Sequence, residues 1–224
     1  MNEYSVRLAE NVYTQGNILI AGALSTGKTT LMRDIGDQLK KKGFSVELIT
    51  PTPIDGERDY TENFMLTKDF ASRLKEYDAL LDDRLKTMAA AHVGYYTKAN
   101  LMPIALIIND FDEYMNDDDY RSVDTIKSII ARLGRLGLRC GIILIIGVIR
   151  PSGSIISSQL KICIDTSIIL GPFNDLTSML MFDVDYSNIG RKENDGVIKT
   201  RESFEVQLFD KTQVSTFWGG LIWI

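Results

Sequence analysis

The chain has 224 residues, of which 45% are hydrophobic and 25% are charged, and it carries a formal net charge of −5. This length accommodates one sizeable α/β domain but is short for two, and the acidic balance makes nucleic acid the less favoured partner. The longest apolar runs, at 142–149 and 162–170, fall short of the ~20 residues that cross a bilayer.

Short apolar segments alternate along the chain with amphipathic patterns, which is typical of a mainly parallel sheet flanked by helices. The expected strands are residues 17–22, 45–50, 104–110, 141–148 and 162–170. The expected helices are residues 28–42, 68–91 and 120–136, and residues 51–66 are expected to form a loop. Two further strands, at 197–200 and 204–209, flank a polar link and predict a terminal hairpin. Because no repeat or linker divides the chain, we expect a single domain over residues 1–224.

A glycine-rich segment between the first strand and the first helix fits the phosphate-binding pattern G-x-x-x-x-G-K-[ST] at every fixed position. It reads GALSTGKT. Its glycines let the loop curl so that backbone N–H groups face the phosphates, and the helix N-terminus adds partial positive charge. Lys28 is expected to reach the β- and γ-phosphates of ATP, and the Thr29 hydroxyl to ligate Mg²⁺. The expected nucleotide-binding residues are Gly22, Ser25, Thr26, Gly27, Lys28, Thr29 and Thr30.

The second half of such a site is an apolar strand that ends in an acid holding Mg²⁺, often followed by a catalytic Glu. The candidate segment is LIINDFDE, residues 106–113, and it allows two registers. In the first, Asn109 stands at the metal position, without charge, and Asp110 at the catalytic position. In the second, Asp110 ligates the metal and Asp112 or Glu113 acts as the base. This second register needs a turn at the strand end, because strand side chains alternate between faces. The sequence leaves open whether ATP is hydrolysed.

Several ordered blocks of the chain resemble the FtsK/SpoIIIE branch of P-loop ATPases, which pump DNA or, in type VII secretion, engage secreted proteins. The blocks are NILIAGALSTGKTT, LKEYDALLDDRLKTM, ALIINDFDEYM and IARLGRLGLRCGIILIIGVIRPSGSII, and the resemblance extends roughly over residues 17–208. It implies a RecA-like P-loop NTPase fold, in which helices flank a mainly parallel β-sheet and a β-hairpin follows at the C-terminus.

Three positions depart from the family pattern while the nucleotide loop stays intact. The family's Asp-Glu pair is Asn109-Asp110 here, and Ile149 stands where a Gln senses the γ-phosphate. The second strand ends in Thr50-Pro51-Thr52 instead of Asp-Pro-Lys. This combination is similar to the C-terminal ATPase modules of the type VII secretion coupling proteins EssC and EccC.

The resemblance implies a nucleotide-binding module with weakened or absent hydrolysis, whose partners are a protein substrate or neighbouring ATPase modules. The alternative is an active DNA translocase or viral DNA-packaging ATPase of the same superfamily, with DNA as partner and a homo-oligomeric ring as assembly. A nucleotide switch of another P-loop class is disfavoured, because the chain has no guanine-specifying Asn-Lys-x-Asp motif.

The chain carries no sign of export. Residues 1–10 are too polar for a secretory signal, and Cys140 and Cys163 lack metal-ligand spacing. We therefore expect reduced thiols in the cytoplasm. The resemblance places the chain at the cytoplasmic face of a membrane complex, with the membrane contacted only through other parts of that assembly.

Overall fold

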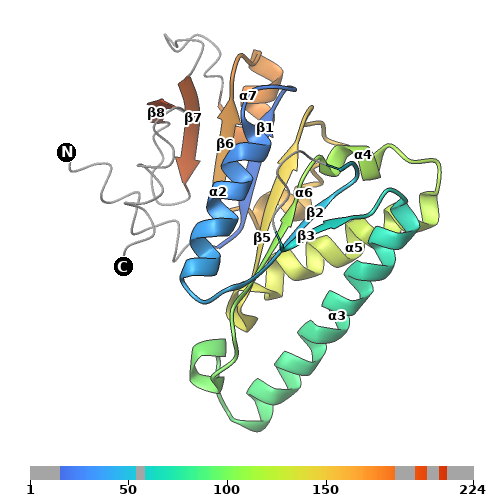
Figure 1. Ribbon diagram of the computed structural model, residues 1–224, viewed down its shortest axis with the longest axis vertical. Helices are drawn as coiled ribbons and strands as arrows, with labels where there is room; N and C mark the ends of the chain where they lie inside the picture. The colour runs from blue at the N-terminus through green and yellow to red at the C-terminus, as the bar shows by residue number, and fades with distance from the viewer. Residues whose placement is uncertain (1–15, 54–58, 185–194, 201–206, 211–224) are drawn as a thin grey trace.

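The computed structural model describes residues 16–53, 59–184, 195–200 and 207–210. An eight-stranded sheet runs through it in the order β3-β2-β4-β5-β1-β6-β7-β8 (Figure 1). All strands from β3 to β6 in this order are parallel, whereas β7 is antiparallel to β6 and β8 to β7. The strands are β1 (Ile18–Gly22), β2 (Ser45–Thr50), β3 (Thr61–Asn63), β4 (Ile104–Ile108), β5 (Ile142–Val148), β6 (Thr166–Leu170), β7 (Asp195–Thr200) and β8 (Gln207–Asp210).

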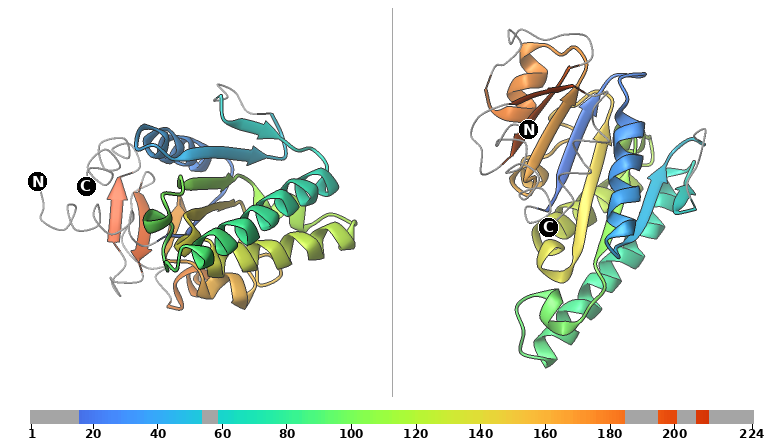
Figure 2. Two further views of the ribbon diagram at one scale, coloured as in Figure 1. Left: turned by 90° about the horizontal axis from the view of Figure 1, so that it is seen from below. Right: turned by 60° about the vertical axis from the view of Figure 1, so that its left-hand side comes forward.

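Helices cover both faces of the sheet, as Figure 2 shows. The helices are α2 (Lys28–Lys41), α3 (Thr67–Ala90), α4 (Phe111–Met115), α5 (Tyr120–Leu136), α6 (Ser158–Ile162) and α7 (Asp175–Phe182), with short 3₁₀ helices at Tyr96–Ala99 and Leu138–Cys140. Successive side chains of β1 point to opposite faces of the sheet, so they pack in two different hydrophobic clusters. Ile18 and Ile20 pack in the cluster that includes α2, and Leu19 and Ala21 in the larger cluster that includes α3 and α5. The expected fold, a mainly parallel β-sheet flanked by helices, is confirmed.

Two stretches differ from what the sequence pattern predicts. The expected strand 162–170 begins only at Thr166, because Ile162 ends α6 and residues 163–165 link that helix to β6. Ser157 caps this helix by accepting a hydrogen bond from the backbone N–H of Leu160 at 3.2 Å. The expected loop 51–66 contains β3, which pairs with Leu48–Thr50. β3 has only the three polar residues Thr61–Asn63, so the hydrophobic pattern gives no sign of it.

The expected terminal hairpin is present as β7 and β8, in which Val197 pairs with Leu208. Residues 201–206 between these strands lie outside the described part of the chain. Within the described residues, no helix is both long enough and apolar enough to cross a membrane.

The sheet topology determines where a ligand can meet the chain. β1 lies between β5 and β6, so the carboxyl ends of these strands and of β4 meet at one edge of the sheet. In open α/β sheets, ligands bind in the crevice outside these carboxyl ends. The glycine-rich loop follows β1 at this edge and leads directly into α2.

Candidate nucleotide site

The loop between β1 and α2 has a backbone that only certain residues adopt. Gly27 has φ 90° and Ser25 has φ 64°, both in the left-handed region. Gly22 cannot carry a side chain without a shift, because a Cβ there would lie 2.5 Å from the Thr26 hydroxyl oxygen. That hydroxyl donates a hydrogen bond to the backbone carbonyl of Ala23 at 2.8 Å, which closes the loop on itself. The loop is therefore curled by its own contacts, as a phosphate cradle requires.

The N-terminus of α2 opens onto this loop. The residue at its N-cap is Gly27, so no side chain caps the helix. The N–H groups of the first helical turn, which include those of Lys28, Thr29 and Thr30, have no intrahelical acceptor. An uncapped helix start beside a curled loop is suited to bind an anion such as a phosphate.

Asn109 lies at the carboxyl end of β4 and faces the start of α2. Its side chain is fully buried, and its Oδ1 accepts hydrogen bonds from Lys28 Nζ at 3.2 Å and from Thr29 Oγ1 at 3.3 Å. This is the position that the first register assigns to the metal acid. The structure therefore brings together Lys28, Thr29 and Asn109, and the residue opposite the Thr29 hydroxyl is a neutral amide.

Asp110 follows in a left-handed conformation, with φ 49° and ψ 48°, at the N-cap of α4. Its carboxylate forms an ion pair with Lys28 and also accepts a hydrogen bond from Asn109 Nδ2 at 2.9 Å. Burial raises the pKa of the nearby Tyr114 phenol, and the negative charge of Asp110 raises it further. The turn required by the second register is thus present, but it directs Asp110 to Lys28.

The remaining acids of this segment lie differently. Asp112 is buried, and its carboxylate accepts hydrogen bonds from the backbone N–H groups of Ile149 at 2.9 Å and Arg150 at 3.3 Å. It therefore ties the turn after β4 to the end of β5. Glu113 is exposed in the first turn of α4. Sequence reasoning missed both the structural role of Asp112 and the Lys28–Asp110 ion pair, since each depends on contacts between distant segments.

The described residues fit ATP better than they fit its metal. The curled loop, the uncapped helix and Lys28 supply donors and positive charge for phosphates. Thr29 would hold Mg²⁺ directly and Asn109 through a water molecule, with Asp110 as the neighbouring carboxylate. Within the described part of the chain, no three or more His, Cys, Asp or Glu side chains gather into a metal site.

A cavity of about 510 Å³ adjoins the phosphate loop at the same edge of the sheet. Its walls include Gly22 and Ala23 of the loop, Arg150 after β5, and Phe173 and Asn174 after β6. Among the described residues that line it, Arg150 is the charged one and none is an Asp or Glu.

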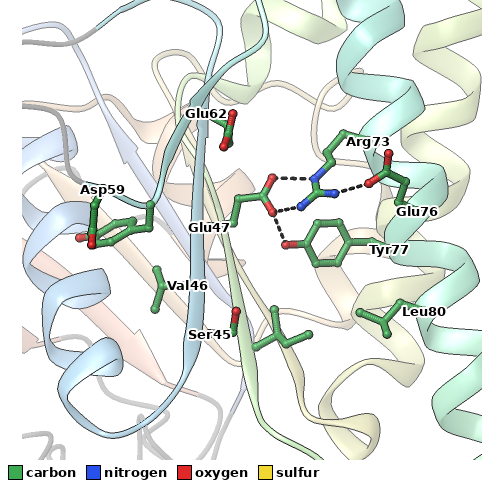
Figure 3. A pocket seen from close by; sticks show the side chains of 11 residues that line it. Ser45, Val46, Glu47, Asp59, Glu62, Arg73, Glu76, Tyr77 and Leu80 are labelled. Carbon is green, nitrogen blue, oxygen red and sulfur yellow. Dashed lines mark hydrogen bonds and ion pairs between the residues drawn. The ribbon is translucent and has the colours of Figure 1, made fainter.

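A second cavity, of about 410 Å³, lies away from the loop, between β2 and α3 (Figure 3). The buried Glu47 carboxylate there accepts hydrogen bonds from Arg73 Nε at 2.9 Å, Arg73 Nη2 at 2.6 Å and the Tyr77 hydroxyl at 2.6 Å. Burial raises the pKa of Tyr77, and Glu47 raises it further. These contacts fasten α3 to the sheet, so we interpret the cluster as structural.

Comparison with known proteins shows the fold of this chain. No family model and no curated protein matches the sequence. Among solved structures, the pCW3 conjugation coupling protein TcpA, in its monomer form with ATPγS, is similar with 21% identity and a TM-score of 0.79 over 90% of this chain and 62% of that one. The cytoplasmic domain of the type VII secretion ATPase EccC from Thermomonospora curvata is similar with 16% identity and a TM-score of 0.69, over 87% of this chain and 25% of that one.

A third similar structure is B204, the DNA-packaging ATPase from Sulfolobus Turreted Icosahedral Virus, with 13% identity and a TM-score of 0.57 over 87% of this chain and 96% of that one. The chain thus spans less than two thirds of the coupling protein and a quarter of the secretion ATPase. At the level of the fold, the expected likeness to FtsK-like and EccC ATPases is confirmed.

Proposed function

We propose that this chain is an FtsK/SpoIIIE-like nucleotide-binding module of a type VII secretion ATPase, with weakened hydrolysis and a role in recognising a protein substrate. The observation that carries the proposal is the buried Asn109 amide opposite Thr29 and Lys28. It leaves the phosphate-binding half of the site whole and puts an uncharged side chain at the position of the metal acid.

The expected loss of hydrolysis follows from the charges at this edge of the sheet. When it is bound, Mg²⁺ neutralises the negative charge that develops on the transferred phosphoryl group. An amide at position 109 offers no negative charge to hold the ion, and Asp110 is one methylene shorter than the Glu that orients the attacking water. Ile149 also cannot hydrogen-bond the γ-phosphate through its side chain. The chain's own residues therefore bind and orient a nucleotide but give little help to its cleavage.

A protein partner agrees with the charge and with one group of the structural neighbours, the type VII secretion ATPases. The chain carries a formal net charge of −5, which opposes a nucleic-acid backbone. ATPases 2 and 3 of Thermomonospora curvata EccC are known in complex with a signal sequence peptide. We infer that the module acts at the cytoplasmic face of a membrane complex, beside neighbouring ATPase modules or as part of a homo-oligomeric ring.

The test is ATP affinity and turnover of the purified chain with Mg²⁺, with and without double-stranded DNA. We expect binding that is lost in Lys28→Ala, and turnover near the uncatalysed background in both conditions. The Lys28→Ala variant should keep its fold and its protein partner, because in this proposal the partner is not bound through the nucleotide. Rapid turnover by the chain alone would contradict weakened hydrolysis.

A DNA translocase or DNA-packaging ATPase is the second candidate, and one observation favours it. B204, the DNA-packaging ATPase of a virus, is matched over 96% of its chain, so nearly all of its fold has a counterpart here. In this case turnover should rise when DNA is added to the assembled oligomer, and it should require Lys28 and Asp110. Failure of DNA to stimulate the oligomer would remove this candidate.

A further inference from the structure

The lysine that should bind phosphates is already engaged by an anion of the chain itself. The Lys28 side chain is 5% exposed and forms an ion pair with the Asp110 carboxylate, which is 17% exposed. The ammonium also donates to Asn109 Oδ1 at 3.2 Å. A nucleotide that needs the Lys28 ammonium must therefore displace a carboxylate from it, because two anions at one buried ammonium repel each other.

Asp110 is held toward Lys28 from more than one side. Asn109 Nδ2 donates to Asp110 Oδ2 at 2.9 Å, which leaves the other carboxylate oxygen for Lys28. The left-handed backbone at Asp110, with φ 49°, turns the chain sharply out of β4. The next residue, Phe111, is buried in the core and fixes the far side of this turn. The carboxylate is thus presented to the lysine by hydrogen bonding and by packing.

We propose that Asp110 is an internal competitor for the nucleotide, whose carboxylate occupies Lys28 until phosphates replace it. The proposal rests on the nucleotide binding proposed above and describes how that site is regulated. On exchange, the phosphates take the Lys28 ammonium, and the partly exposed carboxylate turns to solvent. The exchange also breaks the hydrogen bond from Asn109 Nδ2 to Asp110. Asn109 keeps its contact with Thr29, so a side-chain rotation at Asp110 is sufficient and β4 does not move.

The experiment is isothermal titration of ATP into the full chain and into Asp110→Asn, in buffer with EDTA so that metal ligation plays no part. The substitution keeps the size of the side chain and removes its charge. Hydrogen bonds to charged groups are among the stronger ones in proteins, so we expect ATP to bind Asp110→Asn about tenfold more tightly. Asp118→Asn is the matched control, because it removes the same charge from an exposed position between α4 and α5, and its affinity for ATP should equal that of the wild type.

Thermal unfolding without nucleotide gives a second readout. Asp110→Asn should melt at a lower temperature than the wild type, because it lacks the ion pair. Added ATP should raise its melting temperature by more than it raises that of the wild type. Binding that is equal or weaker in Asp110→Asn, with the wild type binding ATP, would overturn the competitor role and leave the proposed function standing. Binding by neither folded protein would overturn both. Binding by Asp110→Asn alone would support a site that the wild-type carboxylate keeps closed.

Discussion

Asn109→Asp returns a carboxylate to the metal position, and the structure gives the charges that it would meet. Asn109 Nδ2 lies 2.9 Å from Asp110 Oδ2, and Asn109 Oδ1 lies 3.2 Å from Lys28 Nζ. At an effective dielectric constant of about 20, a new charge at these distances experiences about 6 kcal/mol of repulsion and about 5 kcal/mol of attraction. These terms nearly cancel, so the burial of a charge at a position with 0% exposure remains as the net cost.

We therefore expect metal-free Asn109→Asp to be about 2–4 kcal/mol less stable than the wild type. Bound Mg²⁺ would offset both the burial and the repulsion, so the ratio of ATP affinity with Mg²⁺ to that with EDTA should rise by about tenfold. Titration calorimetry measures the affinity and urea unfolding the stability. Asn116→Asp is the matched control, since Asn116 is exposed just after α4. If the ratio of ATP affinity with Mg²⁺ to that with EDTA did not change, the placement of the metal beside Asn109 would be refuted and Asp110 would be favoured as its ligand.

Three further predictions concern stability and are measured by urea unfolding. Asn17→Ala should cost about 3–5 kcal/mol, because the buried Asn17 side chain hydrogen-bonds the backbone at Gly134, Leu144 and Cys163; a cost below about 1 kcal/mol would contradict this. Burial raises the pKa of Tyr77 above its ordinary 10.0, so the folded chain holds this proton more tightly than the unfolded chain does. Stability should then fall as pH rises above about 10, by about 1.4 kcal/mol per unit for this group, and Tyr77→Phe should remove that part of the slope. Gly36→Ala should destabilise by about 1–3 kcal/mol, since a Cβ there would lie 2.9 Å from Tyr60 Oη, whereas Gly153→Ala, with open space, should be nearly neutral.

Much of the fold could be predicted because its strands are buried on both faces. The apolar runs at β1, β4 and β5 therefore stand out in the sequence, and the helices between them carry the spacing of one buried face. The start of β6 could not be predicted from hydrophobicity, because the apolar run begins at Ile162, which ends α6, whereas the strand begins at Thr166. The signal was instead the Ser157 cap, which hydrophobic patterning does not detect.

Part of the nucleotide site could likewise be predicted from the sequence, and part could not. The phosphate loop could be predicted because its chemistry requires a fixed local spacing of Gly22, Gly27 and Lys28. Which acid after β4 would face Lys28 could not be predicted, because one left-handed residue decides it. Asp110 has φ 49°, and this single backbone conformation turns its carboxylate to the lysine while Asp112 reaches the end of β5. These outcomes depend on tertiary contacts that no local pattern encodes.

The two hydrogen bonds between Asp112 and the residues that follow β5 have a consequence for how this chain can diverge. Their donors are main-chain N–H groups at positions 149 and 150, and every amino acid except proline provides one. The anchor is thus indifferent to the side chain at position 149. A polar residue at position 149 can be replaced by isoleucine during evolution. Its side-chain hydrogen bonds are then lost, but the strand end stays anchored. Such an anchor lets the side chain at position 149 vary while the strand end beside the phosphate loop keeps its place.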